Sequence, residues 1–325
     1  MRAAYYEKNG AVRDVLLSQE VDTPQPKTGE VRVRLRTSGV NPSDVKSRLG
    51  TVRKIAFPRV IPHSDGAGEI DAVGPGVAQS RVGERVWVWN AQWKRPFGTA
   101  AEFVVLPSPL AVTLPSHITM EAGACLGIPA MTAVHAVTLA NAAAGRTIFI
   151  SGGAGSVSHY AIQFAKQRGA TVITTVSSPE KARIATDAGA DHAIDYKRED
   201  VGARMKEITG GAMADAMIEL DLTANAKLIP AVLHPHGTVV IYGTMPEATI
   251  PAAFCLVNSI TLKFFLVYEL TDGEREAAIG SIQRALDQDR LVHNVAQKFP
   301  FAEMAAAHEA VESGKVPGNV VVTIR

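Results

Sequence analysis

The stretch 151–158, with the sequence SGGAGSVS, has the residue types and the spacing of a phosphate-binding turn. Gly153 and Gly155 fit the first two glycines of the dinucleotide fingerprint G-x-G-x-x-G, and Ser158 stands at the third position. Glycine removes side chains where backbone must approach pyrophosphate, and a following helix offers unpaired N–H groups at the positive end of its dipole. The stretch is either a phosphate cradle with one altered contact or an ordinary strand-to-helix turn.

The segments on either side of this turn favour the phosphate cradle. Residues 146–151 and 171–176 are short apolar runs that predict strands, and residues 157–168 carry apolar side chains at helical spacing. Strand, turn, helix and strand together form the βαβ unit in which the fingerprint binds dinucleotides. Because Ser158 adds a small side chain where helix and strand normally pack on glycine, we expect slightly looser packing and unchanged phosphate contacts.

The end of the second strand indicates which dinucleotide binds. NAD sites usually place Asp or Glu there to bind the ribose 2′-hydroxyl. This strand ends instead at Ser177 and Ser178, and Lys181 and Arg183 follow. Hydroxyls and a cation hold a 2′-phosphate that a carboxylate would repel, so the sequence predicts NADPH. The alternative for the two cations is a solvated helix face.

Composition fits an ordinary globular protein and excludes several other classes. Lys plus Arg (33) nearly balances Asp plus Glu (32), which argues against a nucleic-acid partner. No apolar run approaches the roughly 18 residues of a membrane helix, and the first residues lack the apolar core of a signal peptide. The two cysteines, Cys125 and Cys255, make neither a disulfide framework nor a four-cysteine zinc site. We therefore expect a cytoplasmic protein without membrane or nucleic-acid partners.

The pattern of elements changes twice along the chain. Residues 29–40, 83–89 and 99–107 alternate apolar and polar side chains, which predicts short strands in a compact sheet. After Pro115, apolar strands alternate with helix-length segments, as in a doubly wound parallel sheet. Residues 319–325 predict a last strand, which we expect to return to the N-terminal β unit.

Five longer stretches resemble the medium-chain dehydrogenases/reductases, and among them the zinc-free, zeta-crystallin-like quinone oxidoreductases. They are VNPSDVKSRLG (40–50), IPHSDGAGEIDAVGPGV (61–77), GACLGIPAMTAVHAV (123–137), the glycine-rich turn with its helix (151–170) and TVSSPEKARIATDAGADHAIDY (175–196). The resemblance covers essentially the whole chain. It implies an α/β fold with a GroES-like, β-rich catalytic domain (1–122 and 260–325) and a Rossmann NADPH-binding domain (123–259). It also implies an active site in the cleft between these domains.

Zinc alcohol dehydrogenases of the same superfamily bind their catalytic metal with a Cys, a His and a second Cys or Asp. Asn41, Ser64 and Ile128 align with these three positions. Zinc requires three or four converging N, S or O ligands, so we expect no metal site. An irregular site made of His63, Asp65 and Cys125 is the alternative, although we expect His63 to be a loop or cleft residue.

Without zinc no Lewis acid polarises the acceptor, so we expect hydride transfer to an acceptor that is already electrophilic. The resemblance implies that Asn41 donates a hydrogen bond to the acceptor oxygen or to the nicotinamide ribose, and that Thr132 lies near the nicotinamide. Lys46 stands where relatives often carry Tyr. It supplies positive charge or a proton there, or is simply a solvent-exposed lysine.

The remaining cofactor residues come from the resemblance and from their place at strand ends. Tyr196 matches a residue near the adenosine 2′-phosphate, with a buried strand-end aromatic as the alternative. Tyr242 and Gly243 follow a strand, at the edge where such folds bind ligands. The segment 265–267 resembles a loop beside the nicotinamide or at a dimer interface. The full set is Gly153, Ala154, Gly155, Ser156, Val157, Ser177, Ser178, Lys181, Tyr196, Tyr242, Gly243, Phe265, Leu266 and Val267.

The sequence thus predicts a metal-free, NADPH-dependent reductase of quinones or other activated conjugated carbonyls. One alternative is an enoyl-thioester or 2-alkenal reductase, with Arg48, Arg53 and Lys54 as candidates to bind carrier phosphates. The alternative for these three cations is a solvated loop. A second alternative is a non-catalytic, NADPH-binding or RNA-binding crystallin-like protein. We expect a small-molecule partner, and a homodimer that joins the edges of two Rossmann sheets.

Overall fold

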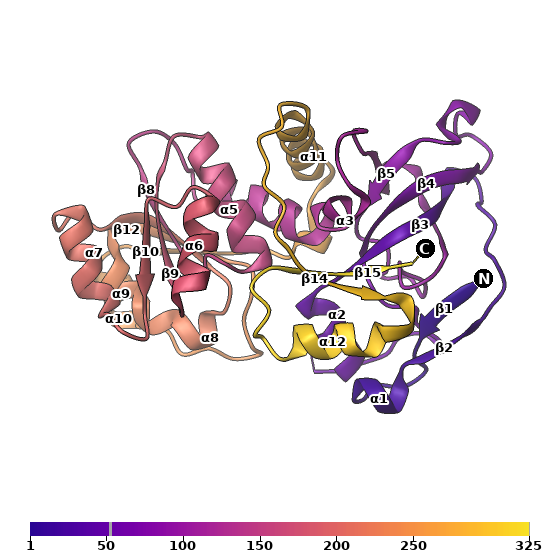
Figure 1. Cartoon of the computed structure of the whole chain (residues 1–325). Helices are drawn as coiled ribbons and strands as arrows, with labels where there is room; N and C mark the ends of the chain where they lie inside the picture. Colours follow the sequence, from indigo (N-terminus) through magenta and orange to yellow (C-terminus); the bar gives the residue numbers. More distant parts are fainter. Residues whose placement is uncertain (52–53, 325) are drawn as a thin grey trace. The chain divides into compact units, whose positions relative to one another are not determined.

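The computed structural model describes residues 1–51 and 54–324, which form two compact units (Figure 1). One unit comprises residues 1–128 and 293–325, and the other comprises residues 129–292. Each unit has its own sheet and its own apolar core. Within the described residues, no helix is both long enough and apolar enough to cross a bilayer.

The first unit is built on a seven-stranded sheet with the order β14-β15-β3-β4-β5-β7, in which β6 also pairs with β3. β1 and β2 form a separate, two-stranded antiparallel sheet. The strands are β1 (Arg2–Tyr5), β2 (Leu17–Glu20), β3 (Glu30–Val40), β4 (Asp65–Val73), β5 (Arg85–Val88), β6 (Phe103–Pro107), β7 (Ala111–Thr113), β14 (Val295–Pro300) and β15 (Asn319–Thr323). The helices are α1 (Val12–Val15), α2 (Pro42–Leu49), α3 (Met120–Gly123) and α12 (Met304–Glu312).

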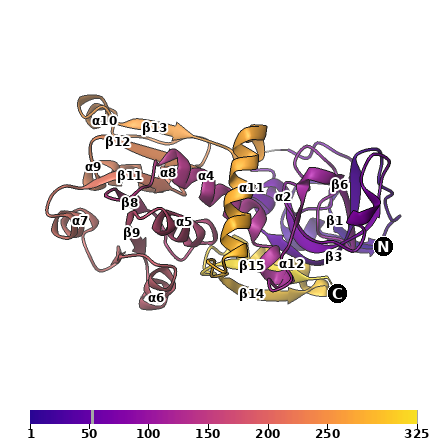
Figure 2. The same cartoon turned by 90° about the horizontal axis from the view of Figure 1, so that it is seen from above.

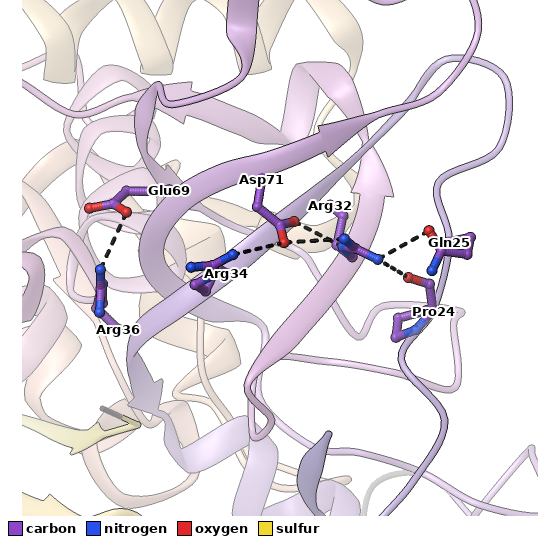
Figure 3. A network of polar contacts seen from close by, with 7 residues as sticks. All are labelled: Pro24, Gln25, Arg32, Arg34, Arg36, Glu69 and Asp71. Atoms are coloured by element: carbon purple, nitrogen blue, oxygen red, sulfur yellow. Dashed lines mark hydrogen bonds and ion pairs between the residues drawn. The ribbon is translucent and has the colours of Figure 1, made fainter.

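The alternation in β3 produces its two faces. Val31, Val33 and Leu35 are fully buried in the core, whereas the intervening arginines point to the opposite face. There Arg32 contacts Asp71 on β4 with an Nε–Oδ1 distance of 2.9 Å, and Arg36 and Glu69 form a second pair (Figure 3). Opposite charges on neighbouring antiparallel strands favour this register.

The end of the chain returns to the first sheet, as the sequence predicts. β15 pairs antiparallel with β3, from Val320 opposite Val40 to Thr323 opposite Thr37, and β14 pairs parallel with β15. Figures 1 and 2 show these yellow strands beside the purple β3.

The second unit is a doubly wound, six-stranded parallel sheet with the order β10-β9-β8-β11-β12-β13. This is the 3-2-1-4-5-6 order of dinucleotide-binding sheets, and helices cover both faces (Figure 2). The strands are β8 (Thr147–Ile150), β9 (Thr171–Val176), β10 (His192–Asp195), β11 (Ala214–Glu219), β12 (Leu233–Ile241) and β13 (Thr261–Phe264). The helices are α4 (Met131–Leu139), α5 (Ser156–Gln167), α6 (Pro179–Asp187), α7 (Val201–Thr209), α8 (Leu222–Asn225), α9 (Ile229–Val232), α10 (Ala252–Val257) and α11 (Asp272–Asp287).

The boundary expected at residue 260 differs in the structure. β13 pairs parallel with β12, from Thr261 opposite Thr238 to Phe264 opposite Ile241, so it is the sixth strand of the nucleotide-type sheet. The chain returns to the first unit only at residue 293, and the first crossing falls after residue 128 rather than after residue 122. An apolar run predicts a strand but does not reveal which sheet supplies its hydrogen-bonding partner.

Candidate nucleotide-binding and active site

The glycine-rich turn joins β8 to α5 and is anchored to β9. Gly152 has a left-handed backbone (φ +66°) and its N–H donates to Thr175 Oγ1 at 3.0 Å. The Gly153 N–H donates to the Thr175 carbonyl at 2.9 Å. A Cβ at Gly153 would lie 2.5 Å from Thr174 Oγ1, so this position accepts only glycine without a shift of β9.

The first turn of α5 begins without a side-chain cap. Its N-cap residue is Gly155, which has no side chain that could accept a hydrogen bond from the first backbone N–H groups. The N–H groups of Ser156 and Val157, in the first turn, are therefore not capped by that residue. Uncapped N–H groups at the positive end of a helix dipole are suited to bind phosphate.

Ser158 ties the helix to the strand instead of loosening their packing. Its side chain is 1% exposed, and its hydroxyl donates to the Ser151 carbonyl at 2.7 Å. The same oxygen lies 3.3 Å from the Tyr242 hydroxyl, which comes from the end of β12. The expected loosening at the third fingerprint position is therefore wrong, because the hydroxyl makes a hydrogen bond that glycine cannot.

The residues expected to bind the 2′-phosphate come together at the ends of β9 and β10. The Tyr196 N–H donates to the Val176 carbonyl at 3.1 Å, which places Tyr196 beside the start of the loop holding Ser177 and Ser178. The Tyr196 side chain is 53% exposed, so the alternative of a buried aromatic is wrong. Ser178 caps α6 by accepting from the Lys181 N–H at 3.3 Å.

Further along the same sheet edge, the segments after β12 and β13 lie side by side. The rings of Tyr242 and Phe265 are 6.5 Å apart, and the His135 ring meets Phe265 edge-on at 4.8 Å. His135 and Thr132 lie one turn apart on α4, and Thr132 is 4% exposed. A Cβ at Gly243 would lie 1.9 Å from the Leu220 carbonyl oxygen. In the last part of this segment Leu266 is exposed, whereas Val267 is buried.

A fully buried carboxylate, Glu219, lies at the end of β11 beneath the turn. It accepts hydrogen bonds from Ser151 Oγ (2.5 Å), the Asp221 N–H (2.6 Å) and Asn225 Nδ2 (2.8 Å). Burial raises the pKa of its side chain, against the effect of these donors. Sequence reasoning missed this residue, and the only signal was an acid at the end of the apolar run AMIE.

In the first unit, a second buried carboxylate holds Asn41. The Asn41 side chain is 5% exposed, and its Nδ2 donates to Asp65 Oδ2 at 2.6 Å. Asp65 Oδ1 accepts from the Ile128 N–H at 2.8 Å, and burial raises the pKa of the Asp65 carboxyl. The Asn41 N–H donates to Asp44 Oδ2 at 2.8 Å, which fixes the start of α2.

Comparison with known proteins finds one family model that matches the first unit and another that matches the second. The model of the alcohol dehydrogenase GroES-like domain matches residues 27–116, and that of the zinc-binding dehydrogenases matches residues 156–284. The chain belongs to the quinone oxidoreductase family of the medium-chain dehydrogenases/reductases. A quinone oxidoreductase of Pseudomonas aeruginosa is 29% identical over 315 residues, which is 95% of each chain.

Two further similar proteins are informative. A 2-haloacrylate reductase of Burkholderia sp. is 27% identical over 335 residues, covering 99% of this chain and 98% of the relative. The structure of a mycobacterial protein complexed with NADPH superimposes with a TM-score of 0.88 at 28% identity, over the full length of both chains.

The residues of this chain do not fit the zinc of the metal-binding family members. Of the positions that align with the ligands, Ile128 has no side-chain donor atom and Asn41 is hydrogen-bonded to Asp65. The described residues hold no group of three or more His, Cys, Asp and Glu side chains that could bind a metal ion. The irregular alternative also fails, because Cys125 Sγ contacts the Glu121 carbonyl and burial raises the pKa of its thiol.

His63 is a core residue rather than a loop or cleft residue. It is fully buried with φ +76°, and its ring stacks on His308 of α12 with a centroid distance of 4.9 Å. Thr99 donates its hydroxyl proton to the Asp65 carbonyl, so Ser38 donates to Thr99 and accepts from His63 Nδ1. His63 Nε2 is then the acceptor and His308 Nε2 the donor of the 2.9 Å contact between the rings.

This histidine pair makes the protein sensitive to acid. Burial lowers the pKa of both rings, that of His308 to about 3, whereas histidine in an unfolded chain titrates near pH 6.5. Between those values the unfolded state binds more protons, so the free energy of unfolding falls as the pH drops below about 6.5. We expect His308→Gln, which keeps a donor toward His63, to reduce this pH dependence in urea unfolding between pH 7.5 and pH 5. His117→Gln, at an exposed histidine of the same unit, is the control, and equal pH dependence in His308→Gln and wild type would contradict the assignment.

The cations considered for carrier phosphates differ in exposure. Arg48 is fully buried, with Nη2 2.7 Å from Glu312 Oε2 and Nη1 2.5 Å from the Gly10 carbonyl oxygen, so it is unable to bind a carrier. Arg53 lies outside the described residues, and Lys54 is exposed beside a cavity of about 230 Å³. Lys46 is half-buried on α2.

Proposed function

We propose that this chain is an NADPH-dependent reductase that transfers a hydride to quinones or other activated conjugated carbonyls, without a metal ion. The observation that carries the proposal is the glycine-rich turn: it leaves the start of α5 uncapped and lies at the edge where β9 ends in two serines. NADPH supplies the hydride when it is bound. The relatives named as quinone oxidoreductases and the NADPH-complexed structure support this proposal.

On the cofactor side, each group of residues has a defined task. Gly153, Ala154 and Gly155 leave room for the pyrophosphate, and the N–H groups of Ser156 and Val157 bind it. Ser177, Ser178, Lys181 and Tyr196 hold the 2′-phosphate. Tyr242, Gly243 and the segment 265–267 border the nicotinamide, because ligands of such sheets bind at the carboxyl ends of the strands.

On the acceptor side, the chain orients and polarises an acceptor that is already electrophilic. Asn41 donates a hydrogen bond to the acceptor oxygen or to the nicotinamide ribose, through the amide N–H that Asp65 does not take. Lys46 supplies positive charge or a proton, and Thr132 lies near the nicotinamide. Charge that develops after hydride attack spreads over the conjugated oxygen, so no Lewis acid is required.

A panel of acceptors tests the proposal. NADPH oxidation is measured with 1,4-benzoquinone, 9,10-phenanthrenequinone, a 2-alkenal and crotonyl-CoA. We expect saturable turnover with at least one of the quinones. Oxidation with none of the four acceptors, by protein that still binds NADPH, would contradict the proposal and favour the non-catalytic alternative.

A carbon–carbon double-bond reductase is the second candidate. The 27% identical relative named 2-haloacrylate reductase favours it, because its name denotes an α,β-unsaturated acid as substrate. Higher kcat/KM with the 2-alkenal or crotonyl-CoA than with either quinone would select this candidate.

Lys181→Ala tests the recognition of the 2′-phosphate. Because a hydrogen bond to a charged group contributes about 1.5–3 kcal/mol, we expect the Kd for NADPH to rise about tenfold or more, and the Kd for NADH to change less than twofold. Fluorescence titration measures both constants, with the exposed Lys206→Ala as the control. Equal losses for the two nucleotides would remove Lys181 from the 2′-phosphate site.

We also propose a homodimer through the edge of the second sheet, in the cytoplasm. β13 is an edge strand, and its neighbourhood exposes apolar side chains: Phe264 (60%), Leu256 (82%) and Val257 (82%). An exposed apolar edge strand favours pairing with another copy. Both cysteines are free, as in a reducing compartment.

Leu256→Asp tests the dimer. We expect light scattering to give about half the wild-type mass, because a symmetric interface places the new charge in both copies. Val82→Asp, at a 40% exposed apolar residue of the other unit, is the control. An unchanged dimer in Leu256→Asp, or a wild-type monomer, would contradict the proposed interface.

A further inference from the structure

Asp65 joins three segments of the first unit. It is the first residue of β4, Asn41 lies between β3 and α2, and Ile128 lies in a single π-helical turn, Leu126–Ala130. One carboxylate oxygen accepts from the Asn41 side chain at 2.6 Å and the other from the Ile128 N–H at 2.8 Å. Two charge-assisted hydrogen bonds from one carboxylate therefore hold the two other segments together.

The surroundings of the carboxylate are built to hold it there. Asp65 is fully buried. A Cβ at Gly127 would lie 2.1 Å from Asp65 Oδ1 and 2.7 Å from its Cγ, so glycine is the residue that leaves room for the carboxylate. The position of Asp65 is thus fixed from both sides, by its donors and by the adjacent turn.

The hydrogen bond also decides how Asn41 presents its amide. A carboxylate only accepts hydrogen bonds, so Asn41 has to turn its NH₂ group toward Asp65. The amide carbonyl oxygen and the second N–H are thereby given fixed directions. Without Asp65 the NH₂ group and the carbonyl oxygen of the Asn41 amide could exchange places. A bound substrate would then face either a hydrogen-bond donor or a hydrogen-bond acceptor.

We propose that Asp65 is a positioning residue: its carboxylate holds together Asn41 and Ile128, which align with zinc-ligand positions, and fixes which end of the Asn41 amide faces the substrate. This inference rests on the proposed reductase function and deepens it. Asp65 acts through Asn41 and does not itself touch the reacting atoms.

A kinetic double-mutant cycle tests this coupling. Asp65→Asn keeps the shape of the side chain but sets its NH₂ group against one of the two donors, the Asn41 NH₂ or the Ile128 N–H. We expect kcat to fall about 10- to 100-fold with the KM for NADPH within about twofold, because misplacement of a positioning group affects the chemical step. In the Asn41→Ala background the same change should lower kcat less than about twofold. Asp71→Asn is the matched control on the same strand, because Asp71 pairs with Arg32 on the outer face.

The exchanged pair separates positioning from stability. Asn41→Asp combined with Asp65→Asn restores a donor opposite an acceptor but turns the carboxylate toward the substrate. We expect the melting temperature to recover toward wild type while kcat stays low. A purely structural role predicts recovery of both and would overturn the inference, as would additive effects on kcat in the cycle.

A spectroscopic measurement keeps the inference testable if Asp65→Asn does not fold. In wild-type protein the Asn41 side-chain amide resonances, assigned by their loss in Asn41→Ala, should exchange with solvent far more slowly than those of the exposed Asn141. Equal exchange would overturn the hydrogen bond and the inference with it. If wild-type protein reduces no acceptor, the proposed function fails and the positioning role falls with it. An active wild type with an additive cycle overturns the inference alone.

Discussion

Replacing Gly153 by valine is expected to raise the Kd for NADPH by about 100-fold or more. A Cβ at this position would lie 2.5 Å from Thr174 Oγ1, 2.7 Å from Thr174 Cγ2 and 3.0 Å from Ala185 Cβ. Thr174 is fully buried and its hydroxyl is bound to the Ile150 carbonyl, so it has no free rotamer to yield. The turn has to move off β9, and the start of α5 moves with it.

The expected rise in the Kd for NADPH follows from the contacts that are lost. The α5 N–H groups would no longer face the pyrophosphate, and loss of two such charge-assisted hydrogen bonds raises the Kd for NADPH by about 100-fold or more. Fluorescence titration measures this constant. Gly273→Val is the matched control, because Gly273 is in the same unit, has an ordinary φ and leaves a Cβ with nothing within 4 Å. Wild-type affinity in Gly153→Val would show that the turn does not bind the phosphates.

Replacing Glu219 by alanine is expected to cost the largest amount of stability. Its carboxylate satisfies the Ser151 hydroxyl, the Asp221 N–H and the Asn225 amide, and removal leaves these donors without an acceptor. Leaving buried donors unsatisfied costs about 1–3 kcal/mol for each group. Ser151 also carries the carbonyl that accepts from Ser158, so the turn loses a support and the Kd for NADPH should rise.

Thermal unfolding and nucleotide titration of the same samples measure both effects. Glu247→Ala, at an exposed glutamate of the same unit, is the control. Glu219→Gln keeps the shape of the side chain and should lie between wild type and Glu219→Ala. A melting temperature of Glu219→Ala equal to that of Glu247→Ala would contradict the network.

The sequence predicts those parts of the fold that periodicity and local spacing determine. The β8–turn–α5–β9 unit and the alternation in β3 follow from patterns within a few residues. The return of β15 is expected because a single last strand has to join an existing sheet. The place of β13 could not be predicted, because an apolar strand has no mark that identifies its sheet. The resemblance implies a boundary at residue 260, and the structure places it at residue 293 for that reason.

Buried polar groups are the harder part of the site to predict. Arg48, His63 and Glu219 are fully buried, although their types are mostly exposed in proteins and no local pattern distinguishes them. Their partners, Glu312, His308 and Ser151, lie far away in sequence. Long-range pairing of this kind is visible only in three dimensions. The roles of Asn41, Lys46 and Thr132 stay predictions, because they depend on where an acceptor binds.

The most direct measurement is NADPH oxidation with 9,10-phenanthrenequinone by protein dialysed against a chelator, with zinc measured in the same sample. The account predicts saturable turnover with less than about 0.1 zinc per chain and no gain when zinc is added back, because the described residues bring no three ligands together. Turnover that disappears on dialysis and returns with one zinc per chain would contradict it.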